Sequence, residues 1–260
     1  MAYKFSACGD WFGGEPHERI YAAKKYGFKA IEMLLWKKFD IEKVKTALDE
    51  TGLELSAILF GSRDESKSQL ISNSHGIVYE DAADAFADSV SETLEACKAL
   101  GCRNIVVTTG NERSDVSREV QKANVIRALK KGAEVVRGSG VKLVLEPLNV
   151  LVNHMGYFLV TTAESIEILN AVDSDDVQLL YDVYHQQISE GNLINNIRAN
   201  ISQIGHIHIG DVPGRKEPGT GEINYPNVFK AIEDVGYSGY ITYECGLSCD
   251  VDEVCSKARK

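Results

Sequence analysis

Several features that would place this chain in a familiar class are missing from its sequence. No apolar stretch approaches the roughly 20 residues that a membrane-spanning helix needs, and the opening MAYKFSACGDW lacks the apolar centre of a secretion signal. Lysine and arginine number 28 against 38 acidic residues, the net charge is −10, and the basic residues form no cluster. Such a chain is repelled by phosphate backbones and anionic lipid. We expect a cytoplasmic protein that binds neither nucleic acid nor membrane.

Cysteine is too sparse to form a disulfide scaffold. The chain has six cysteines, none of them in CxxC spacing, so reduced thiols in packing and surface positions are expected. Cys245, Cys249 and Cys255 lie close enough in sequence to suggest a zinc cluster. Because neither a second cysteine pair nor a nearby histidine completes such a cluster, the packing interpretation is favoured.

Apolar runs of β type alternate with amphipathic helical stretches along the whole chain. Eight such units fill it, and no linker, repeat or low-complexity tract divides it. Neither GxGxxG nor a P-loop follows any strand, which argues against an open nucleotide-binding sheet. The sequence therefore predicts an α/β fold, a (β/α)₈ TIM barrel in a single domain of residues 1–260. The predicted strands are 3–7, 30–34, 54–60, 104–108, 142–146, 177–182, 204–209 and 239–244.

Local signals also predict where several helices begin and end. Asp40 can cap a helix that ends before Gly52, and Thr161 opens another as the first residue of a T-x-x-E capping box. The longest helical pattern covers residues 79–100 and stops at Gly101. A further long pattern covers 116–139, so both are long enough to cover the outside of a barrel.

Four apolar runs in the second half of the chain end on a side chain that can bind a metal. They are LVLEP at Glu146, LLYDV at Asp182, GHIHIGD at His208 and YITYE at Glu244. The carboxyl ends of barrel strands meet at one mouth, and alternate residues share a face, so these groups are expected to converge. A shared divalent cation would compensate three buried carboxylates. This oxygen-rich set without thiolate suits one Mn²⁺, Mg²⁺ or Co²⁺ ion, and Zn²⁺ stays open.

Each of these residues also has a purely structural interpretation. An acidic residue at a strand end can cap the next helix, and this alternative is open for Glu146 and Glu244 taken singly. For Asp182 ligation is favoured, because the following VYHQQI is not a clean helix start. His206 lies one layer deeper than His208 and is expected to be a hydrogen-bonded interior histidine. Surface or packing positions are expected for the isolated His17, His75 and His154.

The segments EPLN, YDVYH, GHIHIGDVPGR, EPGTGEINY and YITYE resemble the xylose-isomerase-like barrel superfamily of sugar isomerases and epimerases. Within it the chain is most similar to hydroxypyruvate isomerases. The resemblance is strong from Glu146 to Glu244 and weaker elsewhere. It implies one divalent metal held by Glu146, Asp182, His208 and Glu244. Barrels of this superfamily often pair, so a homo-oligomer is a further expectation.

The resemblance also implies roles in catalysis. Glu146 and Glu244 would be the acid and base that flank the substrate carbon, while His185 and Arg215 would contact substrate oxygens. A cation chelated by a carbonyl and the neighbouring hydroxyl acidifies the carbon-bound proton and stabilises the enediolate. Return of the proton to the adjacent carbon gives an isomerisation, as from hydroxypyruvate to tartronate semialdehyde, and its return to the other face of the same carbon gives an epimerisation. A loop histidine and a solvated arginine are the alternatives for His185 and Arg215.

Three other features are candidates for roles at the same site. Glu32 ends the second predicted strand and is expected either to contact substrate or ligands or to form an interior ion pair. Asn149 could orient Glu146 or the substrate with its amide, or it could form an Asx turn. The glycine-rich segment 214–222 has the composition of a mobile or tightly turned lid.

The small-molecule substrate is left open by two departures from the family patterns. Hydroxypyruvate isomerases commonly carry glutamine at the position of His208, whereas ketose 3-epimerases carry histidine there. Those epimerases, however, have a glutamate shortly after EPLN, and VLVNHMG here has none. A ketose 3-epimerase and an inosose or 2-oxo-tetronate isomerase therefore remain alternatives. The alternatives from other classes are an endonuclease-like metallo-phosphodiesterase and a non-catalytic sugar-binding barrel, and six histidines with a charge of −10 speak against the former.

Overall fold

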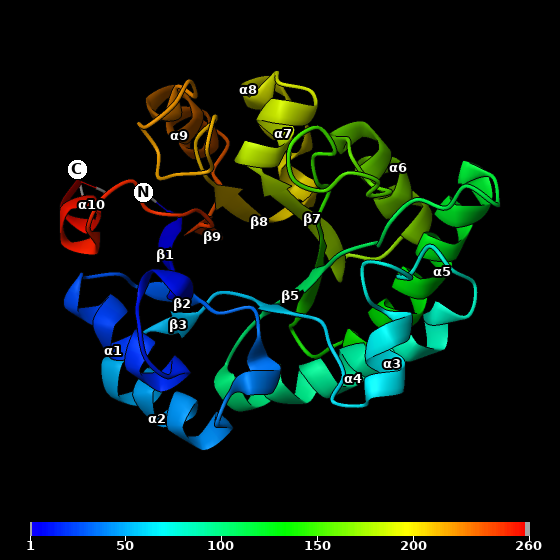
Figure 1. Cartoon of the computed structure of the whole chain (residues 1–260), viewed down its shortest axis with the longest axis horizontal. Coiled ribbons are helices and arrows are strands. Elements are labelled where there is room, and N and C mark those ends of the chain that lie inside the picture. The colour runs from blue at the N-terminus through cyan, green and yellow to red at the C-terminus, as the bar shows by residue number, and fades with distance from the viewer. Residues whose placement is uncertain (1, 258–260) are drawn as a thin grey trace.

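Parallel strands form a ring at the centre of the computed structural model, and helices surround it (Figure 1). The structure describes residues 2–257. Neighbouring strands follow the order β3-β2-β1-β9-β8-β7-β6-β5-β4. The strands are β1 Lys4–Cys8, β2 Ala30–Glu32, β3 Glu54–Leu55, β4 Ile58–Leu59, β5 Asn104–Val107, β6 Lys142–Leu145, β7 Val177–Asp182, β8 Ile204–Ile209 and β9 Tyr240–Tyr243. The predicted strand positions are confirmed, with ends that differ by one or two residues.

The predicted strand 54–60 is divided into the short strands β3 and β4. Its first half pairs with β2, and the Ser56 amide continues that ladder to the Ile31 carbonyl at 2.9 Å. Its second half pairs with β5, and the Phe60 amide donates to the Val106 carbonyl at 3.0 Å. The two halves thus join the ends of the sheet, which gives eight strand positions around the ring. The (β/α)₈ TIM-barrel prediction is confirmed.

Helices follow the strands and pack on the outside of the ring (Figure 1). The helix ends at Asp40, Gly52, Thr161 and Gly101 are confirmed: Asp40 and Thr161 accept amide hydrogen bonds from the first turn, and both glycines have positive φ. The helices are α1 Pro16–Lys25, α2 Ile41–Thr51, α3 Glu65–Leu70, α4 Ala82–Leu100, α5 Arg118–Val136, α6 Thr162–Val172, α7 Val183–Ser189, α8 Leu193–Asn200, α9 Tyr225–Asp234 and α10 Val251–Lys257. Within residues 2–257, none of these helices is both long and apolar enough to cross a membrane.

Two apolar regions stabilise the barrel. The larger lies between the outer faces of the strands and the helices. The smaller fills the interior of the ring with Ala57, Val106, Val144 and Leu180, all of them buried. Val144 and Leu180 each lie two residues before an acidic residue on the same face, so this apolar layer lies beneath Glu146 and Asp182.

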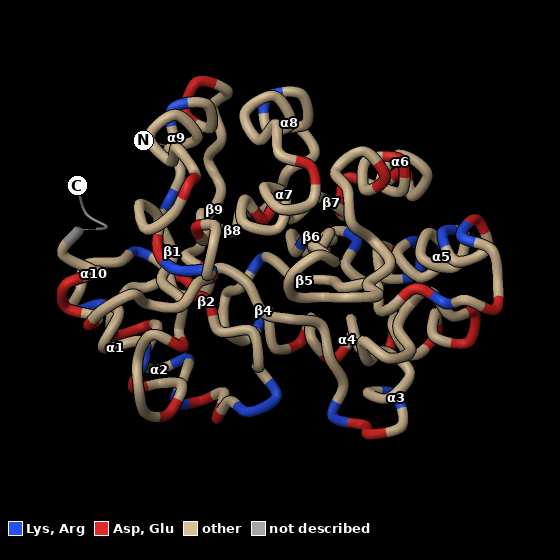
Figure 2. Tube along the Cα trace, turned by 45° about the horizontal axis from the view of Figure 1, so that its top comes forward, with Lys and Arg blue, Asp and Glu red and all other residues tan. Residues whose placement is uncertain are grey.

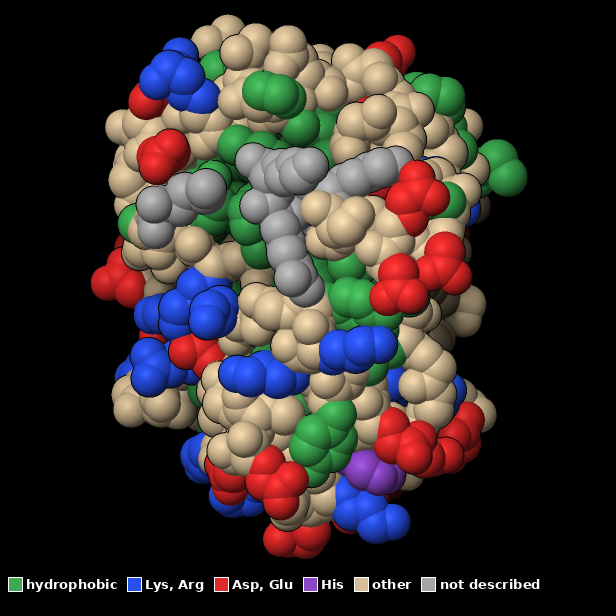
Figure 3. Space-filling view, turned by 90° about the vertical axis from the view of Figure 1, so that its left-hand side faces the viewer, with side chains coloured by type: hydrophobic (Ala, Val, Ile, Leu, Met, Phe, Trp, Pro, Cys, Tyr) green, Lys and Arg blue, Asp and Glu red, His purple; other side chains and the backbone are tan. Residues whose placement is uncertain are grey.

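The outer surface carries charges of both signs, and Lys and Arg are scattered among Asp and Glu along the helices and loops (Figure 2). Apolar side chains gather on the side of the molecule near the two termini (Figure 3). On the outer side of β1 and β9, next to α9, a cleft of about 680 Å³ is lined by aromatic residues that include Tyr3, Phe5, Phe229 and Tyr243. None of the single residues predicted for the site lines this cleft, but Glu217, Pro218, Gly219 and Thr220 of segment 214–222 do.

Candidate active site

Four side chains converge at the carboxyl ends of strands on one side of the barrel. Glu146 directly follows β6, Asp182 ends β7, His208 is in β8 and Glu244 directly follows β9. Each offers one ligand atom, and these atoms all lie within 4.8 Å of one another. We call these four residues the ligand cluster. Sequence periodicity placed them on one face of each strand, and closure of the ring brings the four faces together.

The members of the ligand cluster are close but incompletely paired. Nδ1 of His208 lies 3.0 Å from Oε2 of Glu244 and 3.4 Å from Oε1 of Glu146. Oε1 of Glu146 is buried and has no hydrogen bond. A buried carboxylate oxygen without a donor costs free energy, and a divalent cation would satisfy it. Three carboxylates and one imidazole therefore fit a cation such as Mn²⁺, Mg²⁺, Co²⁺ or Zn²⁺.

Asp182 has a second structural task that the sequence interpretation rejected. Its Oδ1 accepts hydrogen bonds from the amides of Tyr184 at 2.8 Å and His185 at 3.1 Å, so it is the N-cap of α7. The expectation that VYHQQI does not begin a helix is wrong. The two capping bonds and the burial of the first four residues of α7 offset the weak helix propensity of Val183 and Tyr184. Oδ2 stays directed toward the site, 3.2 Å from Nη2 of Arg215.

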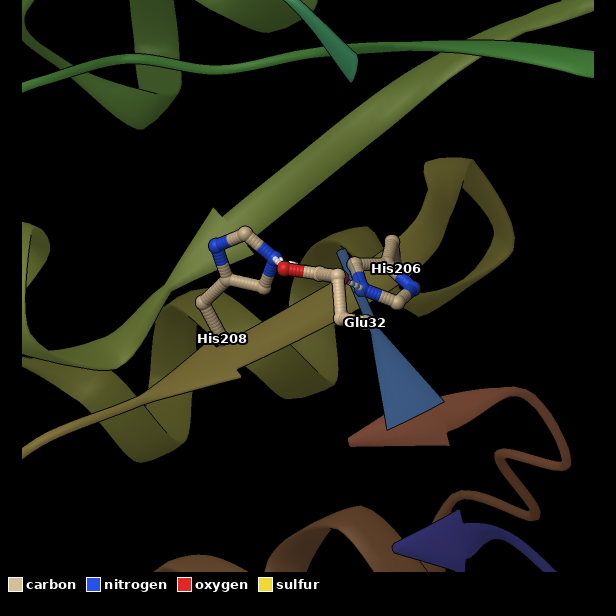
Figure 4. Close-up of side chains that lie close together, drawn as sticks. All are labelled: Glu32, His206 and His208. Atoms are coloured by element: carbon tan, nitrogen blue, oxygen red, sulfur yellow. Dashed lines mark hydrogen bonds and ion pairs between the residues drawn. The ribbon is translucent and has the colours of Figure 1, made fainter. Parts of the chain in front are cut away.

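A second buried group, Glu32 with His206 and His208, shares His208 with the ligand cluster, and the carboxylate of Glu32 lies between the two imidazoles (Figure 4). Oε2 of Glu32, at the end of β2, lies 2.8 Å from Nε2 of His206. Nε2 of His208 lies 3.1 Å from Oε1 and 3.2 Å from Oε2 of the same carboxylate. The hydroxyl of Thr242 adds a hydrogen bond of 3.1 Å. Glu32 thus forms the interior ion pair and, through His208, also contacts a member of the ligand cluster, so features of both alternatives are present. His206 is the interior hydrogen-bonded histidine that was expected.

These surroundings shift the proton affinities of the acidic groups in opposite directions. Burial raises the pKa of Glu146 to about 7, which the contact with His208 opposes and the charge of Glu244 reinforces. For Glu244, burial is outweighed by the charges of His208 and Arg215, so its pKa is lowered. At Glu32, burial alone would raise the pKa, but the charges and hydrogen bonds of His208 and His206 outweigh it and lower the pKa to about 2. Glu146 is thus the carboxylate that most readily holds a proton near neutral pH.

The pKa values of the basic groups are shifted by the same effects, burial and neighbouring charges. Burial opposes the charging of His208, but Glu32 and Glu244 raise its pKa well above the usual value. Burial also opposes the charge of Arg215, and Glu244 and Asp182 nevertheless raise its pKa. At His185, burial prevails over the attraction of Asp182 and lowers the pKa to about 4, so this imidazole is neutral.

Arg215 reaches the ligand cluster from the loop after β8. Its guanidinium pairs with Glu244 and Asp182, and its Nε is buried without a hydrogen bond. The residue has a φ of 51°, an unusual left-handed conformation for arginine. Such a backbone persists only where its surroundings hold it in place.

Asp211 holds this loop, and sequence reasoning missed it. The side chain is fully buried and accepts amide hydrogen bonds from Val212 at 2.9 Å, Gly219 at 2.8 Å and Ile223 at 3.1 Å. These bonds make segment 214–222 a tight turn, and its role as a lid stays a prediction. The available signal was an aspartate just before a glycine-rich and proline-containing segment.

His185 and Asn149 form a buried pair beside the ligand cluster. The Nδ2 amide of Asn149 lies 2.6 Å from Nδ1 of His185, and Oδ1 of Asn149 accepts from the amides of Val152 and Asn153, three and four residues on, in place of the two-residue spacing of an Asx turn. The amide is thus directed at His185 and the turn. His154, expected on the surface or in packing, packs its ring against His185 with 5.2 Å between the ring centres.

Comparison with known proteins agrees with this architecture. A family model described as a xylose isomerase-like TIM barrel matches residues 20–254, and the chain belongs to that family. The hydroxypyruvate isomerase of Escherichia coli K12 is 30% identical over 227 residues, which are 87% of this chain and 86% of the relative. The 2-oxo-tetronate isomerase of Haemophilus influenzae is also 30% identical, with the same shares of 87% and 86%.

Solved structures share the fold over nearly the whole chain. A structure described as an AP endonuclease, family 2, from Brucella melitensis has a TM-score of 0.87 at 26% identity, covering 96% of both chains. The 3-keto-D-glucoside 4-epimerase of E. coli has a TM-score of 0.84 at 25% identity, covering 99% of this chain and 98% of its own. The family is thus one of enzymes whose named members include isomerases and epimerases.

Proposed function

We propose that this protein is a divalent-metal-dependent isomerase of a small hydroxy-carbonyl compound, of the hydroxypyruvate isomerase type. The observation that carries the proposal is the ligand cluster: three carboxylates and an imidazole with ligand atoms within 4.8 Å at the mouth of the barrel. Glu146, Asp182, His208 and Glu244 would hold the cation. When bound, the cation supplies Lewis acidity that acidifies a proton beside a substrate carbonyl.

Glu146 and Glu244 are proposed to move that proton. The pKa of Glu146 is about 7 in the metal-free protein, and a bound cation would lower it, so a ligated Glu146 is an ionised carboxylate that can accept a proton. The lowered pKa of Glu244 supplies a carboxylate that stays ionised. One takes the proton from one carbon, and the other returns a proton to the neighbouring carbon.

Two further side chains are proposed to bind the substrate. Nε of Arg215 and Nε2 of His185 are both buried without a hydrogen bond. Each is a nitrogen that can donate to an oxygen, and the positive charge of Arg215 favours a carboxylate or another anionic oxygen. This arrangement supports a 2-oxo acid such as hydroxypyruvate as the substrate.

A second candidate acts at the same site on a different small molecule. His208, rather than glutamine, is the feature shared with ketose 3-epimerases, and the similarity to a solved L-ribulose 3-epimerase, 26% identical with a TM-score of 0.78, agrees with it. The absence of a second acidic residue in VLVNHMG after Glu146 favours the isomerase. The alternative activities at this site are therefore those of a ketose 3-epimerase and of an inosose or 2-oxo-tetronate isomerase.

The test is an assay of hydroxypyruvate, a 2-oxo-tetronate, an inosose and free ketoses with Mn²⁺, Mg²⁺, Co²⁺ and Zn²⁺, run in deuterated water. We expect turnover of hydroxypyruvate with deuterium on the carbon that receives the proton. Glu146→Gln and Glu244→Gln should each lower the rate by at least about 10²-fold with the fold intact. Glu95→Gln, an exposed carboxylate, is the matched control. Unchanged turnover in both site variants would overturn the proposed mechanism, and turnover of no compound would favour a binding barrel.

A further inference from the structure

The imidazole of His185 is fully buried, and its two nitrogens have different surroundings. Nδ1 faces two N–H groups of Asn149: the backbone amide at 3.2 Å and the side-chain Nδ2 at 2.6 Å. Nε2 has no hydrogen bond and lies 3.5 Å from Oδ2 of Asp182, a member of the ligand cluster. The two ring positions can therefore be assigned separately.

The donors that face Nδ1 are fixed by geometry. A backbone N–H can only donate, so the contact at 3.2 Å requires Nδ1 to accept, however the side-chain amide is oriented. The orientation of that amide is fixed as well. Its oxygen accepts from the backbone amides of Val152 at 3.0 Å and Asn153 at 3.3 Å, so the NH₂ group is left facing His185.

A neutral imidazole carries one proton, and a nitrogen that accepts cannot carry it. The proton of His185 is therefore on Nε2, the nitrogen directed toward the ligand cluster. Burial, which lowers the pKa of His185 to about 4, agrees with a neutral ring. Asn149 is only three residues after Glu146, so one short loop supplies both a carboxylate of the ligand cluster and the group that faces His185.

We propose that Asn149 is a positioning residue that holds His185 as the Nε2–H tautomer, so that His185 donates a hydrogen bond to a substrate oxygen and does not act as a base. The inference rests on the proposed function for the identity of that oxygen, which belongs to the hydroxy-carbonyl compound. Proton removal from carbon is then left to the glutamates. A neutral donor at this place stabilises negative charge that develops on the substrate oxygen.

The direct test is nitrogen-15 NMR of the histidine side chains in the full chain without substrate, with His185→Gln used to assign the signals. In the wild type we expect an unprotonated Nδ1 and a protonated Nε2. Asn149→Asp keeps the shape and the acceptor of the turn but replaces the donating NH₂ by an accepting oxygen. The backbone N–H of residue 149 stays at 3.2 Å from Nδ1, but a charged carboxylate at the 2.6 Å position outweighs this weaker contact, so the proton should move from Nε2 to Nδ1. A wild-type spectrum with a protonated Nδ1 would overturn the inference, whether or not the variants fold.

Kinetics provide the second measurement. With hydroxypyruvate and Mn²⁺, Asn149→Asp should lower kcat at least tenfold and change KM less than threefold, because the lost donor acts on charge that develops during the reaction. A change confined to KM would contradict the inference. The NMR result needs no turnover, so an inactive protein with the expected tautomer would reject the proposed function alone. An active protein with the other tautomer would reject this inference alone.

Discussion

The carboxylate of Glu32 lies 3.1 Å from Nε2 of His208, while the other ring nitrogen of His208 faces Glu244 at 3.0 Å. Glu32 thus orients the imidazole of His208 through Nε2. The other ring nitrogen, Nδ1, faces the ligand cluster. A hydrogen bond from the remote nitrogen of a ligating histidine to a carboxylate fixes the orientation of the ring and raises its basicity. The contact joins β2 to β8 across the interior of the barrel.

Replacing Glu32 by glutamine should therefore weaken metal binding, although Glu32 is outside the ligand cluster. We expect the Kd for Mn²⁺ to rise by about 10- to 100-fold, because the glutamine no longer presents a charged acceptor to His208. Isothermal titration calorimetry measures this change directly. Glu95→Gln, at an exposed position, should leave the Kd unaltered. Equal affinities for wild type and Glu32→Gln would show that the contact does not support the metal site.

Asp182 allows its capping role and its ligand role to be separated with two substitutions. Asp182→Asn keeps a side-chain oxygen that accepts from the amides of Tyr184 and His185, so it should retain the start of α7. Asp182→Ala removes the cap and should be less stable than Asp182→Asn by about 1 kcal/mol. Both variants should lose metal affinity. The measurements are urea denaturation of the metal-free proteins and Mn²⁺ titration, and equal stabilities of the two variants would contradict the capping role.

Glu146 should give the metal-free protein a distinct pH dependence. Its pKa is about 7 when folded against an ordinary value of 4.5, so between these values the folded state holds a proton that the unfolded chain has released. The contribution of Glu146 to stability is therefore lost as the pH rises from 4.5 to 7, by roughly 1–3 kcal/mol. The free energy of unfolding of the wild type, minus that of Glu146→Gln, should fall over this range. Saturating Mn²⁺ should reverse the trend, because it binds the ionised form, and a difference independent of pH would refute the shift.

Asp211 should affect substrate binding through Arg215. Asp211→Ala leaves three loop amides without their acceptor and should cost about 1–3 kcal/mol of stability. The loosened loop should raise KM for hydroxypyruvate severalfold, while the Kd for Mn²⁺ changes little. Asp211→Asn keeps one accepting oxygen and should lie between the wild type and Asp211→Ala. A normal KM in Asp211→Ala would show that Arg215 is held without Asp211.

Much of the site was accessible from the sequence, because its main signals are local. Glu146, Asp182, His208 and Glu244 each follow an apolar run of β type, and period-two alternation predicts which face of the strand they occupy. Helix caps such as Asp40 and Thr161 are also encoded within a few residues. The prediction at Asp182 was incomplete because a carboxylate has two oxygens, and one can cap a helix while the other faces the site.

The sequence by itself determined the eight strand–helix units, the barrel class and the four residues at the strand ends, since these depend on the periodicity of short segments and on family patterns. Only the tertiary structure decided which side chains meet. Glu32 and His206 are 174 positions apart, and Asn149 and His185 are 36 apart, so neither pair leaves a local pattern. Closure of the barrel brings the end of β2 into contact with β8 across the interior, and the loop after β6 against α7. Burial there makes these contacts necessary, because polar groups removed from water must find partners within the protein.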